Sequence, residues 1–273
     1  MLAGRRKPLV AGNWKMNGAS MSLDAARDIA EAAAEASDFV DVMLCPPATL
    51  ISRLDMRCAG TPLLIGAQNC HAEQSGAFTG EISSEMLADA GATAVICGHS
   101  ERREYNSESS ARVKEKALAA HRANLKAIIC VGETETERRA GKAADVIQTQ
   151  LAASLPSSST PDNTIIAYEP VWAIGTGLTP SPNDIGEMHS GIRLFVSDIL
   201  DQARGAGMRI LYGGSVKPSN ASQILALENV DGALVGGASL TAEDFVPIFR
   251  HYVPLAAVAL EMDDLQETET VSG

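Results

Sequence analysis

Short apolar runs alternate with longer helical segments along almost the whole chain, and this alternation restricts the fold more than any other feature. The apolar, β-branched runs predict eight strands, near residues 8–11, 40–44, 63–67, 94–97, 127–131, 164–168, 209–212 and 232–235. Helical periodicity predicts helices at 22–36, 110–123, 143–155 and 185–203. Strands that alternate with helices form βαβ units, so we expect the strands to be parallel.

Two parallel architectures are compatible with this alternation, a closed barrel and a doubly wound open sheet. A nucleotide-binding doubly wound sheet carries a GxGxxG fingerprint at its first β–α turn, whereas this chain has Gly-Asn-Trp-Lys-Met-Asn at 12–17. Its glycine pairs come late instead, at 213–214 and 236–237. The loops after strands seven and eight of a barrel often bind phosphate, and a barrel takes about 250 residues. We therefore predict an α/β fold, a single-domain (β/α)8 barrel of eight parallel strands with outer helices.

No change in composition divides the chain before its C-terminal end. Residues 156–163 are rich in Ser and Pro, which predicts a surface loop. From Glu261 onward the chain is acidic and poor in apolar residues, a composition typical of disorder. The predicted domains are therefore a catalytic barrel over residues 1–260 and an acidic, disordered tail over residues 261–273.

Charge and cysteine content exclude several classes of function. The formal net charge of −12 argues against nucleic acid and anionic membranes as partners, because both require clustered positive charge. The five cysteines are scattered and form no CxxC pair, which argues against a disulfide framework and a zinc site. No apolar run approaches the roughly 20 residues of a membrane span, and residues 1–7 lack the apolar region of a secretory signal. We expect a cytoplasmic protein.

Polar residues suited to catalysis follow several predicted strands at the same end. In a β/α barrel the active site is built at the carboxyl ends of the strands, where this chain places Asn13, Lys15, His99, Ser100, Glu101 and Glu169. Each residue taken alone is compatible with an ordinary structural role, such as a solvated surface lysine or a buried core histidine. Unrelated surface residues have no reason to occur repeatedly at one end of successive strands, so together they predict an active site.

These residue types suit proton abstraction next to a carbonyl group. Glu169 can remove such a proton only if the developing oxyanion is stabilised, which donors such as Lys15 and His99 would do. Residues 100–102 predict the start of a helix, whose positive end would disfavour the imidazolium form of His99 and keep the ring neutral. We also expect Glu101 to pair with Lys15.

The segment that follows Glu169 has the composition of a lid. Pro170 stands at one end and a Gly-Thr-Gly run at the other, and the residues between them are apolar. An apolar flap excludes water when it closes, and flexible ends allow it to move. The predicted lid consists of Pro170, Val171, Trp172, Ala173, Ile174, Gly175, Thr176 and Gly177.

Five motifs of the chain resemble the triosephosphate isomerase family, in the family's order and at matching separations. They are Gly-Asn-Trp-Lys-Met-Asn (12–17), Gly-His-Ser-Glu-Arg-Arg (98–103), Ala-Tyr-Glu-Pro-Val-Trp-Ala-Ile-Gly-Thr-Gly (167–177), Tyr-Gly-Gly-Ser-Val (212–216) and Val-Gly-Gly-Ala-Ser-Leu (235–240). The resemblance implies interconversion of dihydroxyacetone phosphate and D-glyceraldehyde 3-phosphate through an enediol(ate), in glycolysis and gluconeogenesis.

The resemblance also implies a role for each site residue. Glu169 matches the family's general base and His99 its electrophile and proton shuttle. Lys15 matches the positive charge near the substrate, and Asn13 a hydrogen-bond donor beside it. The amides expected to bind phosphate are those of Gly175, Ser215, Gly236 and Gly237. No cofactor or metal is implied, and the five histidines show no metal-ligand spacing.

Residues 68–83 resemble the family's third loop, which implies a homodimer. In that arrangement the loop, with Thr79 near its tip, inserts beside Asn13 and Lys15 of the other subunit. The small phosphorylated triose and a second copy of the chain are then the expected partners.

Two other functions were open on the residues alone. A Schiff-base aldolase on a phosphate-binding barrel would need a lysine inside the barrel, and the sixth predicted strand, 164–168, contains none. A barrel that only binds ligands would be favoured by loss of Glu169, His99 or Lys15, and the chain has all three.

Overall fold

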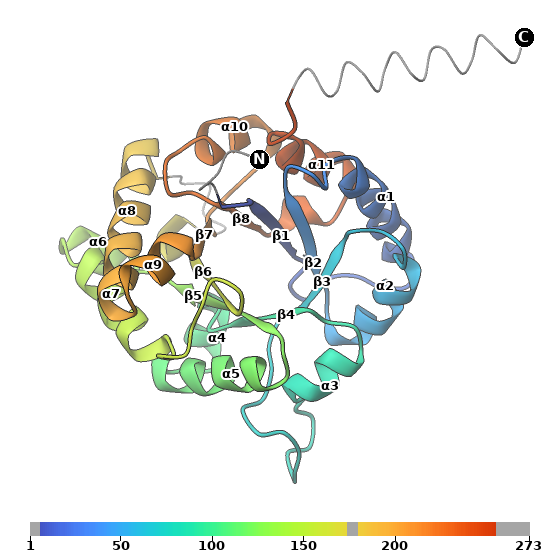
Figure 1. Ribbon diagram of the computed structural model, residues 1–273, viewed down its shortest axis with the longest axis horizontal. Helices are drawn as coiled ribbons and strands as arrows, with labels where there is room; N and C mark the ends of the chain where they lie inside the picture. Colours follow the sequence, from blue (N-terminus) through green and yellow to red (C-terminus); the bar gives the residue numbers. More distant parts are fainter. Residues whose placement is uncertain (1–5, 174–179, 255–273) are drawn as a thin grey trace, which may run out of the picture.

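Eight parallel strands close into a barrel in the order β1-β2-β3-β4-β5-β6-β7-β8 (Figure 1). The computed structural model describes residues 6–173 and 180–254. The strands are β1 (Leu9–Asn13), β2 (Asp41–Cys45), β3 (Leu64–Ala67), β4 (Ala94–Cys97), β5 (Lys126–Val131), β6 (Thr164–Tyr168), β7 (Arg209–Tyr212) and β8 (Gly232–Val235). The predicted fold class is confirmed, and β4, β6, β7 and β8 have the predicted bounds.

The barrel has two separate apolar cores because side chains alternate along every strand. Residues of one parity point inward and fill the barrel: Leu9, Ala11, Met43, Cys45, Ala94, Ile96, Ile128, Cys130, Ile165, Ala167, Leu211 and Leu234. Residues of the other parity, such as Val10, Ile166 and Ile210, pack outward against the helices. This alternation decides which residues beyond the strand ends face the mouth of the barrel.

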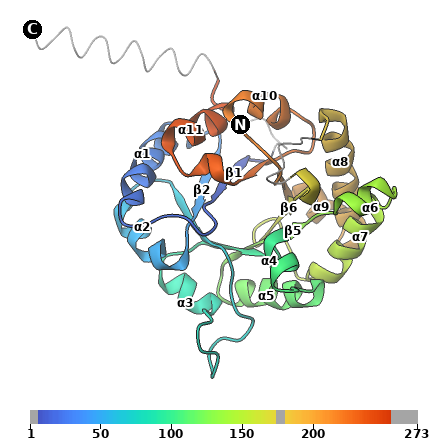
Figure 2. The same cartoon turned by 180° about the vertical axis from the view of Figure 1, so that it is seen from behind.

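The helices form a ring around the strands, as both end-on views show (Figures 1 and 2). They are α1 (Ser22–Glu35), α2 (Ile51–Arg57), α3 (Ser84–Asp89), α4 (Ser100–Tyr105), α5 (Ser110–Arg122), α6 (Glu135–Arg139), α7 (Ala143–Ser154), α8 (Pro182–Ile199), α9 (Gln202–Gly207), α10 (Pro218–Leu225) and α11 (Ala242–Arg250). Short 3-10 helices occur at η1 (Ala48–Leu50), η2 (Val171–Ala173) and η3 (Gly237–Ser239). Among the described residues, no helix has both the length and the apolar character needed to cross a membrane.

The predicted single helix over residues 185–203 is wrong, because the segment forms two helices, α8 and α9. The break comes at Asp201, whose side chain accepts a hydrogen bond from the Arg204 amide at 2.8 Å and so caps a new helix. The second helix folds back closely onto the first. A Cβ at Gly205 would lie 2.6 Å from the backbone nitrogen of Ser197.

Two other sequence predictions concern the ends of the structured part. Residues 156–163 form the connection between α7 and β6, without helix or strand, as predicted. The predicted end of the barrel at residue 260 and the acidic tail over 261–273 lie outside the described residues.

A buried histidine on α8 packs between two tyrosines behind the strands. The His189 ring lies 5.8 Å from the ring of Tyr168 and 6.2 Å from that of Tyr212. Its Nδ1 donates to the Asn229 carbonyl at 3.1 Å, and its Nε2 has no hydrogen-bond partner among the described residues. Burial lowers the pKa of His189 to about 4.

We expect His189 to make the stability of the protein fall as the solution is acidified. The folded chain takes up this proton only near pH 4, whereas the unfolded chain does so near the ordinary pKa of about 6.5. Between these values the unfolded state binds more protons than the folded state. The free energy of unfolding therefore decreases as the pH is lowered, by up to about 3 kcal/mol. Urea denaturation between pH 7 and pH 4.5 should show a shallower fall for His189→Gln, which can still donate to Asn229. Equal slopes for the two proteins would contradict this account.

Candidate active site

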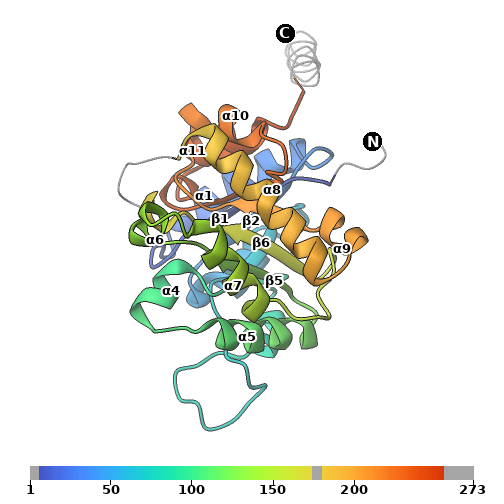
Figure 3. The same ribbon diagram turned by 90° about the vertical axis from the view of Figure 1, so that its left-hand side faces the viewer.

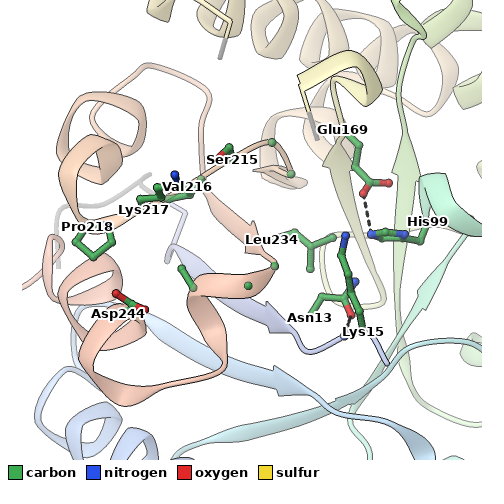
Figure 4. Close-up of a pocket in the computed structure, with 15 residues that line it drawn as sticks. Asn13, Lys15, His99, Glu169, Ser215, Val216, Lys217, Pro218, Leu234 and Asp244 are labelled. Carbon is green, nitrogen blue, oxygen red and sulfur yellow. Dashed lines mark hydrogen bonds and ion pairs between the residues drawn. The ribbon is translucent and has the colours of Figure 1, made fainter. Parts of the chain in front are cut away.

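A cavity of about 410 Å³ opens at the carboxyl ends of the strands. Residues from β1 and β8, from the loops that follow β1, β4, β6, β7 and β8, and from the first turns of α10 and α11 line it (Figure 4). The lining consists of Asn13, Lys15, His99, Glu169, Gly213, Gly214, Ser215, Val216, Lys217, Pro218, Leu234, Gly236, Gly237, Ala238 and Asp244. The structure thus brings together all the predicted catalytic residues and the described members of the predicted phosphate site.

Strand alternation explains most of this convergence. The inward parity of β6 runs through Ile165 and Ala167 and continues to Glu169, directly after the strand. In β1 it runs through Leu9 and Ala11 to Asn13, the last residue of the strand. These side chains face the mouth because the sheet geometry that fills the barrel below continues above it.

His99 has the outward parity of β4, so the chain must turn to aim it into the mouth. Gly98 makes that turn, with a φ of +72° in the left-handed region that favours glycine. A Cβ at Gly98 would lie 2.5 Å from Cγ2 of Val113. His99 then caps the start of α4, with its Nδ1 accepting a hydrogen bond from the Glu101 amide at 3.3 Å.

The Glu169 carboxylate is buried against the start of α4. Its oxygens accept hydrogen bonds from the Ser100 amide at 2.9 Å and the Ser100 hydroxyl at 3.3 Å, and the His99 Nε2 lies 3.0 Å from Oε1. Burial is the strongest single influence and by itself raises the pKa of Glu169. His99, the Ser100 amide and the Cys130 thiol together outweigh burial, and the pKa of Glu169 lies below its ordinary value. The group is therefore an ionised base, held away from solvent.

The backbone that carries Glu169 is also fixed. The Glu169 amide donates to the Val131 carbonyl of β5 at 2.8 Å. Gly132, the residue after β5, packs against Glu169 so closely that a Cβ at Gly132 would lie 1.8 Å from the Glu169 carbonyl oxygen. Movement of the carboxylate must therefore come from the side chain or from the chain beyond residue 169.

The neighbours of His99 influence its pKa in opposite directions. Because Nδ1 accepts the Glu101 amide hydrogen, the proton of the neutral ring sits on Nε2, where it points to Glu169. Burial is the strongest single influence and by itself lowers the pKa of His99, but the carboxylates of Glu169 and Glu101 together raise it above its ordinary value. The helix start is expected to disfavour the imidazolium form, and these two carboxylates act in the opposite direction.

Lys15 is held in an unusual backbone conformation with its ammonium in the mouth. Its φ of 53° lies in the left-handed region, and hydrogen bonds fix both sides of the residue. Its amide donates to Asn13 Oδ1 at 3.0 Å, and its carbonyl accepts from Gln68 Nε2 at 2.8 Å. The Nζ lies 2.7 Å from Oε1 of Glu101, which confirms the predicted pair.

Glycine-rich turns form the opposite side of the cavity. Gly213 must lack a side chain because a Cβ there would lie 2.8 Å from Cγ of Glu169. A Cβ at Gly236 would lie 3.6 Å from Cε of Lys15, so this turn comes close to the cation. With Ser215 and Gly237 these turns present backbone to the cavity, the arrangement that suits an anion such as phosphate.

The first part of the predicted lid is tied down by a buried carboxylate that sequence reasoning missed. Glu133 Oε1 accepts from the Tyr168 hydroxyl at 3.1 Å and from Trp172 Nε1 at 2.9 Å, and the Arg138 guanidinium lies 4.8 Å from the centroid of the Trp172 ring. Val171–Ala173 form the 3-10 helix η2. The remaining predicted lid residues, Ile174, Gly175, Thr176 and Gly177, lie outside the described residues.

Other lining residues were also not predicted. Leu234 is the inward residue of β8, and extending the strand alternation would have identified it. Lys217 and Asp244 reach the cavity from the loop after β7 and from α11, and nothing in their local sequence signals this position. In the part of the chain that the structure describes, no three His, Cys, Asp or Glu residues form a cluster that could hold a metal ion.

The cavity combines an ionised carboxylate, a histidine N–H, a lysine ammonium and a glycine-lined cradle. This combination is typical of a β/α-barrel enzyme that moves protons on a small phosphorylated molecule. Comparison with known proteins agrees. The family model described as triosephosphate isomerase matches residues 8–252. The chain therefore belongs to the triosephosphate isomerase family.

Individual relatives and a solved structure are similar over nearly the whole chain. The triosephosphate isomerase of Rhizobium meliloti (strain 1021) is 55% identical over 252 residues, which cover 92% of this chain and 98% of the relative. That of Afipia carboxidovorans is 55% identical and covers 90% of this chain and 98% of its own length. The crystal structure of triosephosphate isomerase from Bartonella henselae has a TM-score of 0.85 at 47% identity, covering 91% of this chain and all of the other.

Proposed function

We propose that this enzyme interconverts dihydroxyacetone phosphate and D-glyceraldehyde 3-phosphate with Glu169 as the general base. The contact of Glu169 with His99 across the mouth, at 3.0 Å, carries the proposal. It places a base and a hydrogen-bond donor within reach of adjacent atoms of one small molecule. Family membership supplies the reaction, which serves glycolysis and gluconeogenesis.

Glu169 must leave its present partners to act on substrate. Both carboxylate oxygens are engaged by Ser100 and His99. In this position the base is held by protein groups and is not free to contact a substrate. A substrate in the cavity would compete for His99, and the released carboxylate would then remove the proton next to the carbonyl. Once Glu169 swings away, the stronger of the two carboxylates that raise the pKa of His99 is gone, which favours the neutral ring as donor.

Lys15, His99 and Asn13 would stabilise the charge that develops on the substrate oxygens. His99 Nε2–H already points into the mouth. Because Oδ1 of Asn13 is occupied by the Lys15 amide, its side-chain nitrogen is left to donate. Lys15 adds a positive charge whose pairing with Glu101 fixes its direction. Donors placed in advance cost no reorganisation when the oxyanion forms.

The phosphate would bind at the glycine-rich side of the cavity. The backbone amides of Ser215, Gly236 and Gly237 are the proposed donors there, together with Gly175 of the lid. Such a local cluster of donors binds an anion even though the chain carries a net charge of −12. Closure of Pro170–Gly177 over the bound phosphate would exclude water from the enediolate.

The interior of the barrel argues against the Schiff-base alternative. Lys126 has the inward register of β5, but it stands at the amino end of the strand, opposite the mouth, where its Nζ donates to the Asp162 carbonyl. The inward-facing residues of the buried cluster above it are apolar or cysteine. Lys15 lies above them, at the mouth, and is paired with Glu101. Proton transfer, unlike imine formation, needs only the carboxylate of Glu169 and the donors of His99 and Lys15.

A coupled assay that follows isomerisation of glyceraldehyde 3-phosphate tests the proposed function. We expect turnover by the full chain in the presence of a chelator, without added metal or cofactor. A folded chain that is inactive in this assay would refute the proposal. The assignment of the base is tested with the Glu169 variants in the Discussion.

We further propose a homodimer in which segment 68–83 inserts beside Asn13 and Lys15 of a second subunit, with Thr79 near the contact. The segment between β3 and α3 projects from the body of the barrel (Figures 1 and 3). Phe78 on this segment is 44% exposed, and Met16, next to Lys15, is 96% exposed. Two exposed apolar side chains of this kind are what a second copy would cover.

Light scattering should give the mass of two chains at micromolar concentration. Phe78→Asp should shift the equilibrium toward monomer, because it places a charge in the proposed interface. Leu194→Asp, on α8 and 67% exposed, is the matched control and should leave the mass unchanged. A monomeric wild type would contradict the dimer.

The remaining proposals concern the setting of the enzyme. We place it in the cytoplasm, as one catalytic domain over residues 1–260. The five cysteines are all unpaired and buried, which fits a reducing compartment.

A further inference from the structure

Side-chain hydrogen bonds hold both backbone polar groups of Gly98, the residue directly before His99. Its N–H donates to Oε2 of Glu108 at 3.1 Å, and its carbonyl accepts from Nε of Arg103 at 2.9 Å. Gly98 is also the residue whose left-handed φ turns His99 into the mouth. The two hydrogen bonds therefore hold the turn that determines where His99 points.

Glu108 belongs to a buried ion pair. Its side chain is 3% exposed and that of Lys116 on α5 is 5% exposed. Oε1 of Glu108 pairs with the Lys116 ammonium. Nε of Arg102 lies 3.6 Å from the same oxygen. Removing two charges from water costs about as much as their attraction returns, so a buried pair is poor evidence for a role in stability.

Lys116 also reaches the base of segment 68–83. Its ammonium donates to Oδ1 of Asn69 at 2.7 Å, and its backbone carbonyl accepts from the thiol of Cys70 at 3.8 Å. One connected set of contacts thus runs from this segment through Lys116 and Glu108 to the peptide before His99.

We propose that Glu108, oriented by Lys116, is a positioning residue for His99. It fixes the Gly98 turn by supplying the acceptor for the Gly98 N–H, and Lys116 keeps that acceptor in place by holding its other oxygen. The inference rests on the proposed role of His99 in isomerisation. Without the acceptor, the buried N–H of Gly98 loses its partner, the left-handed turn loosens, and His99 shifts relative to Glu169.

Two double variants isolate this role, because they differ only in whether Gly98 keeps an acceptor. Lys116→Met/Glu108→Leu removes both charges and the acceptor. Lys116→Met/Glu108→Gln removes both charges but leaves an amide oxygen for the Gly98 N–H. We expect the first to lower kcat by about 10- to 100-fold, since small misplacements of a catalytic group cost this much. KM should stay within about twofold, and the second variant should recover most of kcat.

The ring nitrogens of His99 give a readout that does not depend on activity. The 15N resonances of His99 should move in Lys116→Met/Glu108→Leu and return toward the wild-type positions in Lys116→Met/Glu108→Gln. If the wild type proves inactive as an isomerase, these resonances still test whether Glu108 positions His99. Failure of the proposed function and failure of this inference are therefore separate results.

The matched control is another ion pair that ties α5 to the same region. Arg122 Nε lies 2.7 Å from Oε1 of Glu85, and Arg122 donates to the Ala72 carbonyl at 3.2 Å. This pair does not contact Gly98. Arg122→Met/Glu85→Gln should leave kcat and the His99 resonances unchanged.

Two outcomes would overturn the inference. The first is equal kcat values and equal His99 resonances in the two Lys116/Glu108 double variants. The second is a loss of kcat in the control as large as in Lys116→Met/Glu108→Leu. If the leucine variant does not fold, Glu108→Gln alone replaces it. Lys116 then competes with Gly98 for the one amide oxygen, so kcat should be lower than in Lys116→Met/Glu108→Gln, and a kcat equal to or above it would refute the proposal.

Discussion

Glu169→Gln is expected to lower kcat by about 10³-fold, because it removes the group that takes the proton while keeping the size of the side chain. The variant should still fold, since the amide oxygen can accept one of the hydrogen bonds that Ser100 and His99 now give to the carboxylate. The coupled assay measures the loss, and thermal unfolding checks the fold.

Glu169→Asp separates the chemistry of the base from its position. It keeps a carboxylate but withdraws it by one methylene. The backbone cannot follow, because the Glu169 amide is fixed to Val131 and Gly132 packs against its carbonyl. A displacement of this size should lower kcat by about 10²-fold. Glu133→Gln, at a second buried carboxylate nearby, should not remove the proton-transfer step, so its kcat should stay well above that of Glu169→Gln. A Glu169→Gln variant with the kcat of the wild type would show that Glu169 is not the base.

Much of the site could be predicted because strand positions determine which residues face the barrel mouth. β6 was predicted with its observed bounds, and its alternation already places Glu169 on the inward face. The glycine turns follow β7 and β8, whose observed bounds also match the prediction, whereas Asn13 is the last residue of β1 and lies two residues beyond the predicted end of that strand. Side chains alternate between the two faces of a strand, so the sequence of a strand predicts which face its last residues and the residue after it occupy.

The parts that could not be predicted depend on contacts between residues distant in the sequence. Helix periodicity continues through Asp201, and only the cap on Arg204 and the packing of Gly205 onto Ser197 show that the helix breaks there. The pKa of His99 is raised by Glu169, 70 residues away in the sequence, which lies 3.0 Å from its Nε2. Glu108 and Lys116 carry no motif, and only the fold places them beneath the Gly98 turn.

Figure 4 places the ammonium groups of Lys15 and Lys217 on different sides of the cavity, and this difference should separate their functions. Lys15→Met is expected to lower kcat/KM by about 10²- to 10³-fold, because the developing oxyanion and the phosphate lose a partly buried positive charge. The chain carries a net charge of −12, so a local cation also matters for attracting an anionic substrate.

Lys15→Met should cost little stability, which makes the kinetic result interpretable. Methionine has the same unbranched stem, so the left-handed backbone at this position is no more strained than with lysine. The lost pair with Glu101 is partly solvated, with side chains 29% and 41% exposed, and such a pair contributes less than about 1 kcal/mol. Lys217→Met removes a cation from the same cavity but from its exposed rim, and should change kcat/KM by less than about fivefold. If both variants lose activity equally, the charge of Lys15 acts only through the general field of the cavity and not at the reacting atoms.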